Sequence, residues 1–466
     1  MIRIYNHYIS TVFLVLFVIE YCIFFTAMYF GNELRFLYTK SWYSDSQILL
    51  ESFLFATILA ISLAGIGLYR RNLGLSEYEL LSRTSVAFSV SILVLVTVYY
   101  ISPAFIIARS ILVYALIIAL IGMLICRYIF NKIAGQSLLQ KKILLIGSGN
   151  NANKILNSKS GYIHRGFDII GCFSTTQEKI IVPTHHILNA NDENNKTIID
   201  IVHQHKINEI VVALDDRRTS MPVNELLDCK ISGIEIIDLL SFYEREKAYL
   251  DLDNLQPSWM VFSDGFAQSG LRTIAKRLVD ISTSFLLLVL AFPVMLLTIL
   301  AIYLESGFRA PIIYRQTRVG ENNQNFDVLK FRSMKTDAEA QGIQFAKVND
   351  TRITKVGNFI RKARIDELPQ IFNVFKGDMS FVGPRPERPV FVEEFETNIP
   401  YYRERHRIKP GITGWAQLCY PYGENEYDAI QKLQYDLYYV KNYSLFLDLT
   451  IIIHTVEVVL WGKGAR

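Results

Sequence analysis

Four apolar runs in the first 130 residues constrain the fold of this chain more than any other feature. They lie at about 10–30, 48–69, 85–107 and 111–130. Each is close to the roughly 20 residues that a helix needs to cross the hydrocarbon core of a bilayer. The chain has 466 residues, of which 51% are hydrophobic and only 20% are charged, which is typical of a membrane protein. We therefore predict a transmembrane four-helix bundle over residues 1–135.

Basic residues near the ends of these runs predict how the bundle is oriented. Arg70, Arg71 and Arg83 lie between the second and third runs, and Lys132, Lys141 and Lys142 follow the fourth. Loops rich in Lys and Arg stay in the cytoplasm, so both ends of the bundle are expected there. Glu20, inside the first run, is costly in lipid. It either serves a function or, as we expect, faces a polar partner within the bundle.

Cysteine usage indicates a reducing compartment for the polar parts of the chain. The five cysteines are Cys22, Cys126, Cys172, Cys229 and Cys419, and no two of them have CxxC spacing. Neither a zinc site nor a disulfide framework is therefore indicated.

From residue 141 the pattern changes to short apolar runs that alternate with helical stretches. KKILLIGSGNNANKIL combines a buried strand, a glycine turn and a helix start, and DIIGCF, INEIVVALDD and GIEIIDL follow as strands. This alternation predicts a Rossmann-like parallel α/β domain over 141–262. Gly147, Gly149 and Ala152 match a dinucleotide-binding turn, but Asp168 does not stand at an obvious strand end to bind a ribose. We favour a sheet domain without bound NAD.

A fifth apolar run, 278–305, contains Pro293 near its middle. An interior proline removes a helical hydrogen bond and kinks the helix. Lys276 and Arg277 precede the run, and Arg309, Arg315 and Arg318 follow it, so both ends favour the cytoplasmic side. We predict a re-entrant helix that enters the membrane, bends at Pro293 and returns. The alternative is a kinked span that would put everything after residue 305 outside the cell.

The segment 309–376 is strongly basic. It carries 13 Lys or Arg and 7 Asp or Glu, a balance of +6 that exceeds the +4 of the whole chain. No recognition helix or repeated aromatic platform accompanies it, so nucleic acid is not an expected partner. Phosphate-bearing small molecules and anionic lipid head groups suit a basic patch beside a membrane helix.

Two adjacent acids, Asp366 and Glu367, lie inside this basic segment, in RKARIDELPQIFNVFKGDMSFVGPRPERP. Residues 360–367 have helical character, and Pro369 suits the first turn of a following helix that ends near Gly377. The acids then lie at the start of that helix, where they can share one Mg²⁺ with phosphate and water.

The arginines around the acids favour one kind of chemistry. Arg361, Arg364 and Arg385 are expected to keep Asp366 ionised, so that it can attack phosphorus. Arginine side chains also bind phosphate oxygens well. The pattern predicts phosphoryl transfer. A solvated salt-bridge cluster is the alternative, whereas a glycosidase pair would need no ring of arginines.

A family resemblance is carried by KRLVDIS with a later FP, IIYRQTRVGENNQNFDVLKFRSMK, TRITKVGNFIRKARIDELPQIFNVFKGDMSFVGPRPERP and YYRERHRIKPGITGWAQ. These stretches cover residues 272–466 nearly end to end. The chain resembles the bacterial polyprenyl-phosphate sugar-1-phosphate transferases, in their large monotopic form. ELLDCKISGIEIIDL and QPSWMVFSDGF, nearer the front, resemble one branch of these enzymes.

The resemblance implies roles for individual residues. Asp366 matches the nucleophile and Glu367 its partner, and both would hold Mg²⁺. The remaining implied substrate-binding residues are Arg361, Arg385, Pro384, Pro386, Lys330, Arg332 and Arg318, of which the two prolines shape the nucleotide pocket. The expected architecture is a mixed membrane protein with a transmembrane bundle, a Rossmann-like domain and an α-rich cytoplasmic catalytic domain over 272–466.

The implied activity is transfer of a sugar-1-phosphate from a UDP-sugar to undecaprenyl phosphate. UMP would leave, an aspartyl phosphosugar would form, and assembly of an exopolysaccharide or O-antigen unit would begin. The implied location is the cytoplasmic face of the bacterial inner membrane. The sequence does not identify the sugar.

Two other functional hypotheses remain open. A membrane-tethered, NAD-dependent nucleotide-sugar dehydratase or epimerase would use the glycine turn together with Tyr243 and Lys247, which have YxxxK spacing. A scaffold role would use the 141–262 domain to bind partners or to form a homodimer.

Two membrane segments carry specific expectations. The family breaks its membrane-dipping helix at Ser-Pro, whereas this chain has Phe292 before Pro293 and so keeps only the proline. The run 445–461 is apolar with interspersed charges, which predicts an interfacial helix rather than a further span.

Overall fold

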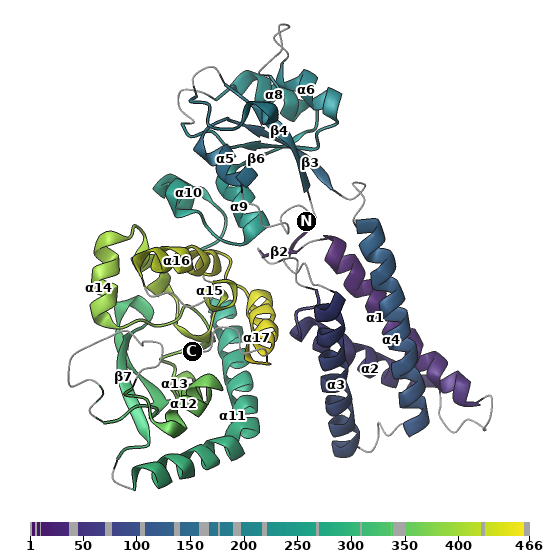
Figure 1. The fold of residues 1–466 in the computed structure, drawn as a ribbon, viewed down its shortest axis with the longest axis vertical. Coiled ribbons are helices and arrows are strands. Elements are labelled where there is room, and N and C mark those ends of the chain that lie inside the picture. The colour runs from purple at the N-terminus through teal and green to yellow at the C-terminus, as the bar shows by residue number, and fades with distance from the viewer. Residues whose placement is uncertain are drawn as a thin grey trace. The chain divides into compact units, whose positions relative to one another are not determined.

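The computed structural model describes most of the chain (Figure 1). The described residues are 2–4, 7–9, 11–36, 45–69, 77–102, 108–134, 140–157, 167–175, 178–189, 197–216, 221–266, 270–307, 310–336, 338, 351–420 and 425–460. Arg70, Arg71 and Arg309, which entered the orientation argument, lie outside them. Two compact units result, Met1–Ile2 with Tyr8–Lys247 and Arg3–His7 with Ala248–Arg466. Two short strands, β1 (Ile2–Ile4) and β2 (His7–Ile9), come first.

Long apolar helices follow, as the runs predict. They are α1 (Thr11–Phe36), α2 (Asp45–Gly65), α3 (Glu77–Ile101) and α4 (Arg109–Ala134). Helix α1 packs against α2 and α4, and α2 packs against α3. With α11 (Gly270–Ser306), five helices in the described part of the chain are long and apolar enough to cross a membrane. The chain is therefore a membrane protein.

Buried charges hold these helices together. Arg127 donates to both carboxylate oxygens of Glu20, from Nε to Oε1 at 2.7 Å and from Nη2 to Oε2 at 3.0 Å. The Tyr69 hydroxyl adds a hydrogen bond to Glu20 Oε2 at 2.5 Å. The expected polar partner of Glu20 is thus confirmed. Arg83 was predicted to lie between the second and third apolar runs. It is instead a buried residue of α3 and donates to the Ile66 carbonyl at 2.8 Å.

A parallel α/β domain is confirmed after α4. Its strands are β3 (Lys141–Ile146), β4 (Phe167–Phe173), β5 (Glu209–Val212) and β6 (Glu235–Asp238), in the order β4-β3-β5-β6. Its helices are α5 (Asn150–Asn157), α6 (Ile198–His205), α8 (Val223–Ile231) and α9 (Leu239–Lys247), with the short η4 (Thr184–His186). Side chains of β3, β5 and α6 form its apolar core. The glycine turn joins β3 to α5.

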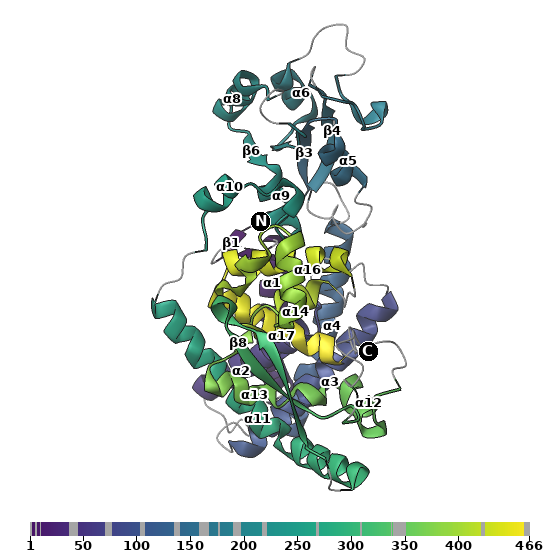
Figure 2. The same ribbon diagram turned by 90° about the vertical axis from the view of Figure 1, so that its left-hand side faces the viewer.

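Helix α11 forms the base of the second unit. It follows η5 (Leu252–Asn254) and α10 (Pro257–Phe262), contains Pro293, and bends part-way along its length (Figures 1 and 2). Its first limb contacts α13 (Gln370–Lys376), β9 (Ser380–Val382) and α17 (Leu445–Leu460). Its second limb, after Pro293, packs Met295 and Ile302 in one apolar cluster with Phe331 and Ile360. Both limbs therefore contact the same unit.

The remaining elements complete this unit. Strands β7 (Ile313–Val319) and β8 (Asn325–Phe331) pair antiparallel around η6 (Glu321–Asn323), and β9 pairs in parallel with β10 (Gly411–Thr413). The helical elements are α12 (Lys355–Lys362), η7 (Ile365–Glu367), α14 (Pro389–Asn398), η8 (Tyr402–Arg407), α15 (Trp415–Cys419) and α16 (Glu426–Lys441). Helix α17 packs on β9 and β10.

Candidate active site

A short 3-10 turn presents the two acids. The Thr354 hydroxyl caps the start of α12 by accepting from the Gly357 N–H at 2.8 Å, and α12 ends at Lys362. Arg364 then adopts a left-handed conformation with φ of +54°, which breaks the helix before η7. The helical character expected for 360–367 is therefore present but interrupted at Ala363 and Arg364. The following helix is as predicted, because α13 begins directly after Pro369 and ends at Lys376, with Gly377 as its C-cap.

Glu367 is held by two cations. Its Oε1 accepts from Lys330 Nζ at 3.0 Å and from Arg385 Nη2 at 2.7 Å. Burial on its own raises the pKa of this carboxyl, but the charges and hydrogen bonds of the two cations outweigh burial. The pKa of Glu367 is therefore well below its usual range. Glu367 therefore stays ionised.

Asp366 differs from Glu367 in its hydrogen bonding and in the direction of its pKa shift. No group in the described residues donates a hydrogen bond to its carboxylate, which is half-buried. Burial, and then the charge of Glu367, raise its pKa from 3.8 to about 6. The nearby cations oppose this rise without cancelling it. With a pKa of about 6, Asp366 is still mainly ionised at neutral pH, as expected, but burial and Glu367 outweigh the charges of Lys330, Arg361 and Arg385.

The loop after β9 delivers Arg385. A Cβ on Gly383 would come within 2.3 Å of the Lys409 carbonyl oxygen, so only glycine allows the loop to pass β10 this closely. Arg405 Nη2 donates to the Arg385 carbonyl at 2.8 Å, and Arg318 Nη1 donates to the Pro386 carbonyl at 3.2 Å. Arg318 thus supports the loop through its backbone.

Two further predicted residues lie at the end of β8. Lys330, on the strand, reaches Glu367, and Arg332 directly follows the last strand residue, Phe331. Nη1 of Arg332 is buried and has no hydrogen-bond partner among the described residues. A buried guanidinium nitrogen without an acceptor suits an anionic ligand.

Sequence reasoning missed the residues of α11 that hold the site. Lys276 and Arg277 were interpreted as charges flanking a membrane helix, but both are used inside the protein. Arg277 donates to the Val374 and Phe375 carbonyls at 2.6 and 2.7 Å, which caps the C-terminal end of α13. The only sequence signal for this role was the basic pair of Lys276 and Arg277, with Asp280 four residues after the lysine.

The lysine of this pair belongs to a buried cluster under β9. Lys276 Nζ donates to Asp448 Oδ2 at 2.9 Å and to the Val382 carbonyl at 3.0 Å. Asp280 Oδ1 accepts from the Ser380 hydroxyl at 2.9 Å and from the Phe381 N–H at 3.0 Å. The first turns of α11 therefore hold both segments next to the predicted site residues, α13 through Arg277 and β9 through this cluster.

A metal would have to rely on the two adjacent acids. Among the described residues, no group of three or more His, Cys, Asp or Glu side chains could hold a metal ion. Mg²⁺ needs only one or two carboxylates when phosphates and water complete its shell. The Asp366 carboxylate and the second oxygen of Glu367 fit that requirement.

The glycine turn of the α/β domain is filled by side chains of its own domain. The Ser148 N–H donates to Glu178 Oε2 at 2.6 Å. The Asn150 and Asn151 N–H groups donate to the two oxygens of Asp215 at 2.8 and 2.9 Å. These N–H groups are the ones that a pyrophosphate would use.

The dehydratase or epimerase hypothesis also depends on the YxxxK pair, Tyr243 and Lys247. Tyr243 is only 3% exposed, and Lys247 Nζ lies 4.8 Å from the centroid of its ring. A tyrosine that transfers protons to a substrate has to reach that substrate. The described structure gives this alternative no support.

Comparisons with known proteins agree with the geometry of the second unit. A family described as bacterial sugar transferase matches residues 271–462, and one described as CoA-binding domain matches 64–228, which includes the filled glycine turn. An Aeromonas hydrophila protein named UDP-N-acetylgalactosamine-undecaprenyl-phosphate N-acetylgalactosaminephosphotransferase is 41% identical over 52% of this chain and 56% of its own length. Proteins of Escherichia coli and Xanthomonas campestris, both named UDP-glucose:undecaprenyl-phosphate glucose-1-phosphate transferase, are each 31% identical. They cover 74% and 73% of this chain and 74% and 70% of their own lengths.

Proposed function

The chain belongs to the bacterial polyprenyl-phosphate sugar-1-phosphate transferases, and on this premise we propose that it moves a sugar-1-phosphate from a UDP-sugar to undecaprenyl phosphate. The names of its relatives specify this donor and acceptor class. The observation that carries the proposal is the division of roles between the two acids. Glu367 is fixed by Lys330 and Arg385, whereas Asp366 has no hydrogen-bond donor in the described residues.

The reaction has two displacements at one phosphorus atom. An Asp366 oxygen attacks the β-phosphorus of the UDP-sugar, and the bond to the bridging oxygen breaks, so that UMP leaves. A phosphate oxygen of undecaprenyl phosphate then attacks the same phosphorus. The bond to Asp366 breaks, which frees the carboxylate and leaves a sugar diphosphate on the lipid.

The basic residues stabilise the phosphates during both steps. Two cations remain to bind phosphate oxygens. Nη1 of Arg332 has no hydrogen-bond partner among the described residues, and the charge of Arg361 acts on Asp366. Lys330 and Arg385 hold Glu367. Mg²⁺, bound by Asp366 and Glu367, would supply further positive charge for the diphosphate.

The position of α11 supports a re-entrant helix and a catalytic part on the cytoplasmic face of the inner membrane. Both limbs of α11 pack against one unit, whereas a spanning helix would carry its second limb to the opposite side. Apolar side chains such as Phe285, Leu297 and Leu304 are more than half exposed and suit lipid contact. Self-association through the α/β domain stays a prediction, which the mass of the protein in native-like lipid would test.

The decisive experiment measures the nucleotide released from a panel of UDP-sugars by purified protein with Mg²⁺ and undecaprenyl phosphate. We expect UMP from one sugar, and a fall of at least about a thousandfold in Asp366→Asn, because the nucleophile is lost. Asp168→Asn, at an exposed position on β4, is the matched control and should keep full activity. Release of UDP, or full turnover by Asp366→Asn, would refute the mechanism.

A further inference from the structure

The amino-terminal segment belongs to the unit that carries the predicted site, although it precedes the membrane helices in the sequence. Arg3–His7 forms one compact unit with Ala248–Arg466. His7 is buried in this unit, with 8% of its surface exposed. Arg3 lies nearer the surface and pairs with Asp264, with 3.5 Å between Nη1 and Oδ2. The segment is therefore part of the fold of the second unit.

His7 lies among three aromatic rings of this unit. Its Nδ1 is 2.8 Å from the Tyr438 hydroxyl, which makes a buried hydrogen bond. Its ring meets those of Trp415 and Tyr438 edge-on, with 5.6 and 6.0 Å between centroids, and the Phe446 centroid is 6.4 Å away. Burial, and then the neighbouring His454, lower the pKa of His7 to about 4, so the ring is neutral at pH 7. A neutral ring avoids the cost of burying a charge.

Two of these rings adjoin residues that hold β9. Tyr438 precedes Tyr439, whose hydroxyl donates to Asp448 Oδ1 at 2.5 Å and to the Val382 carbonyl at 3.1 Å. Phe446 lies two positions before Asp448 on α17. The segments of α16 and α17 that contact His7 are therefore the ones that fix the end of β9.

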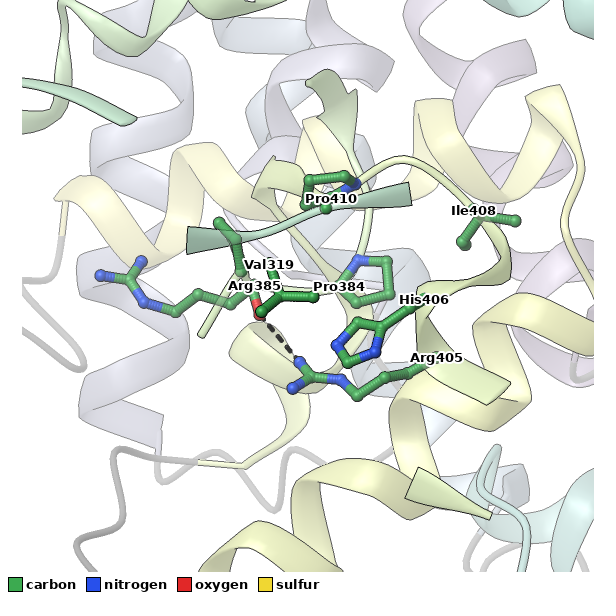
Figure 3. Close-up of a pocket in the computed structure, with 9 residues that line it drawn as sticks. Val319, Pro384, Arg385, Arg405, His406, Ile408 and Pro410 are labelled. Carbon is green, nitrogen blue, oxygen red and sulfur yellow. Dashed lines mark hydrogen bonds between the residues drawn. The ribbon is translucent and has the colours of Figure 1, made fainter. Parts of the chain in front are cut away.

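Trp415 connects the third side of this cluster to the loop after β9. It follows β10, whose last residue, Thr413, accepts a hydrogen bond at its carbonyl from the Gly383 N–H at 2.9 Å. The loop that starts there carries Arg385, whose side chain points away from the small pocket beside the loop (Figure 3) and reaches Glu367 Oε1 at 2.7 Å. A shift of β10 would therefore move a cation that holds Glu367.

We propose that His7 is a positioning residue for the predicted active site, because the amino-terminal segment inserts its ring among the elements that fix β9 and the loop of Arg385. The proposal rests on the proposed function, since its main readout is UMP release. Helix α1 begins at Thr11, four positions after His7. The segment thus joins the first membrane helix to the part of the chain that holds the two acids.

The test compares His7 variants of the full chain in detergent, by kcat for UMP release and by the Kd of UMP. In His7→Ala we expect kcat to fall about tenfold, because displaced reacting groups are costly, while the Kd changes less than about threefold. His7→Phe, which keeps a ring, and His7→Asn, whose amide can replace Nδ1, should each recover part of the loss. His203→Ala, on the exposed side of α6, is the control and should keep wild-type values.

A double-mutant cycle tests whether His7 acts through its hydrogen bond. Tyr438→Phe removes the hydroxyl that lies 2.8 Å from His7 Nδ1. His7→Phe should lower kcat in the wild-type chain but cause no further loss in Tyr438→Phe, since both changes remove the same bond. Full multiplication of the two losses would show that the residues act independently and would contradict the proposal.

Cross-linking tests the position of the segment without any activity. In a cysteine-free background, Arg3→Cys and Asp264→Cys should be joined within one chain by a short bis-maleimide, because the native side chains pair. Adding His7→Ala should lower the yield. The corresponding single-cysteine chains are the controls. An absent cross-link in the folded protein would show that the segment is not docked and would refute the proposal.

Thermal unfolding shows whether each variant is folded, and His7→Phe and His7→Asn decide the question if His7→Ala is not. Wild-type kcat in the folded variants would overturn the proposal and leave the proposed function intact. An equal loss of kcat and of UMP affinity would do the same, because it would indicate general loosening of the unit. Absence of UMP release from the wild-type protein would overturn both.

Discussion

Asp366 and Glu367 are neighbours in the chain, but the fold gives them opposite environments. Glu367 faces Lys330 and Arg385, and its pKa is well below the usual range, despite its burial. Asp366 is influenced mainly by burial and by the negative charge of Glu367, which raise its pKa to about 6. Under the proposed mechanism Asp366 has to be ionised to attack, so this difference would set the pH range of the reaction.

The first prediction concerns that pH range. The pKa of Asp366 is raised, so its carboxyl is protonated below about pH 6 and ionised above it. We expect kcat/KM for the UDP-sugar to fall about tenfold per pH unit below pH 6 and to level off above it. The measurement is the initial rate of UMP release from pH 4.5 to pH 8. A flat profile across pH 6 would contradict the assignment of Asp366.

Glu367→Gln provides a check on the cause of the shift. Removing the negative charge, and freeing Lys330 and Arg385 to act on Asp366, both lower the pKa of Asp366. The low-pH limb of the remaining activity should therefore move to lower pH. The maximal rate should also fall, because Arg385 loses its partner. An unchanged limb would mean that another group titrates near pH 6.

At the scale of elements, α11 is both a membrane helix and the support of the active site. Its first turns hold α13 through Arg277 and β9 through Asp280. The acids precede α13 and Arg385 follows β9, so the spacing between them depends on α11. These residues of α11 are positioning residues, since they act through the segments they hold.

The second prediction follows from this arrangement. Arg277→Ala and Asp280→Ala should each lower kcat about 10- to 100-fold, because small displacements of reacting groups are costly. UMP binding should change less than about threefold, since both side chains bind protein backbone and neither is a predicted substrate-binding residue. Arg315→Ala, at an exposed position on β7, is the control. An equal loss of kcat and UMP affinity would indicate general unfolding instead, which thermal unfolding would reveal.

The third prediction concerns the glycine turn after β3. A pyrophosphate would have to displace two carboxylates that already accept from the turn, and it carries the same sign of charge. We therefore expect millimolar CoA or NAD to leave the Tm of the full chain unchanged. A saturable rise in Tm would show that Glu178 and Asp215 move aside. Glu178→Ala should lower the Tm of the domain, because the Ser148 and Asp215 N–H groups lose their acceptor.

At the scale of the whole molecule, the same chain combines membrane helices with a part that, under the proposed function, acts on a lipid phosphate. The apolar helices would then concentrate the protein where the polyprenyl acceptor resides. Helix α11 joins this environment to the acids within one element. The topology of α11 is therefore the property on which access to the acceptor depends.

The fourth prediction tests that topology. In a cysteine-free background, Gly270→Cys and Ser306→Cys mark the two ends of α11. If α11 is re-entrant, a membrane-impermeant maleimide added to intact cells should label neither position. Both should react once the membrane is permeabilised. Labelling of Ser306→Cys alone in intact cells would establish a spanning helix and place the second limb outside.

The sequence by itself determined the features that depend on local order along the chain. The length of the apolar runs identified the membrane helices, because the hydrocarbon core has a defined thickness. Alternating short runs identified the parallel sheet, and Pro369 and Gly377 marked the ends of α13. The acids Asp366 and Glu367 were recognisable from their type and spacing together with the family resemblance.

Contacts between residues that are far apart in the chain are set by the tertiary structure. Lys276 and Asp448 are 172 positions apart and Lys330 and Glu367 are 37 apart, so no local pattern could indicate either pair. The different pKa values of the two acids and the filling of the glycine turn arise in the same way. Burial and charge act through space, and only the folded chain defines those distances.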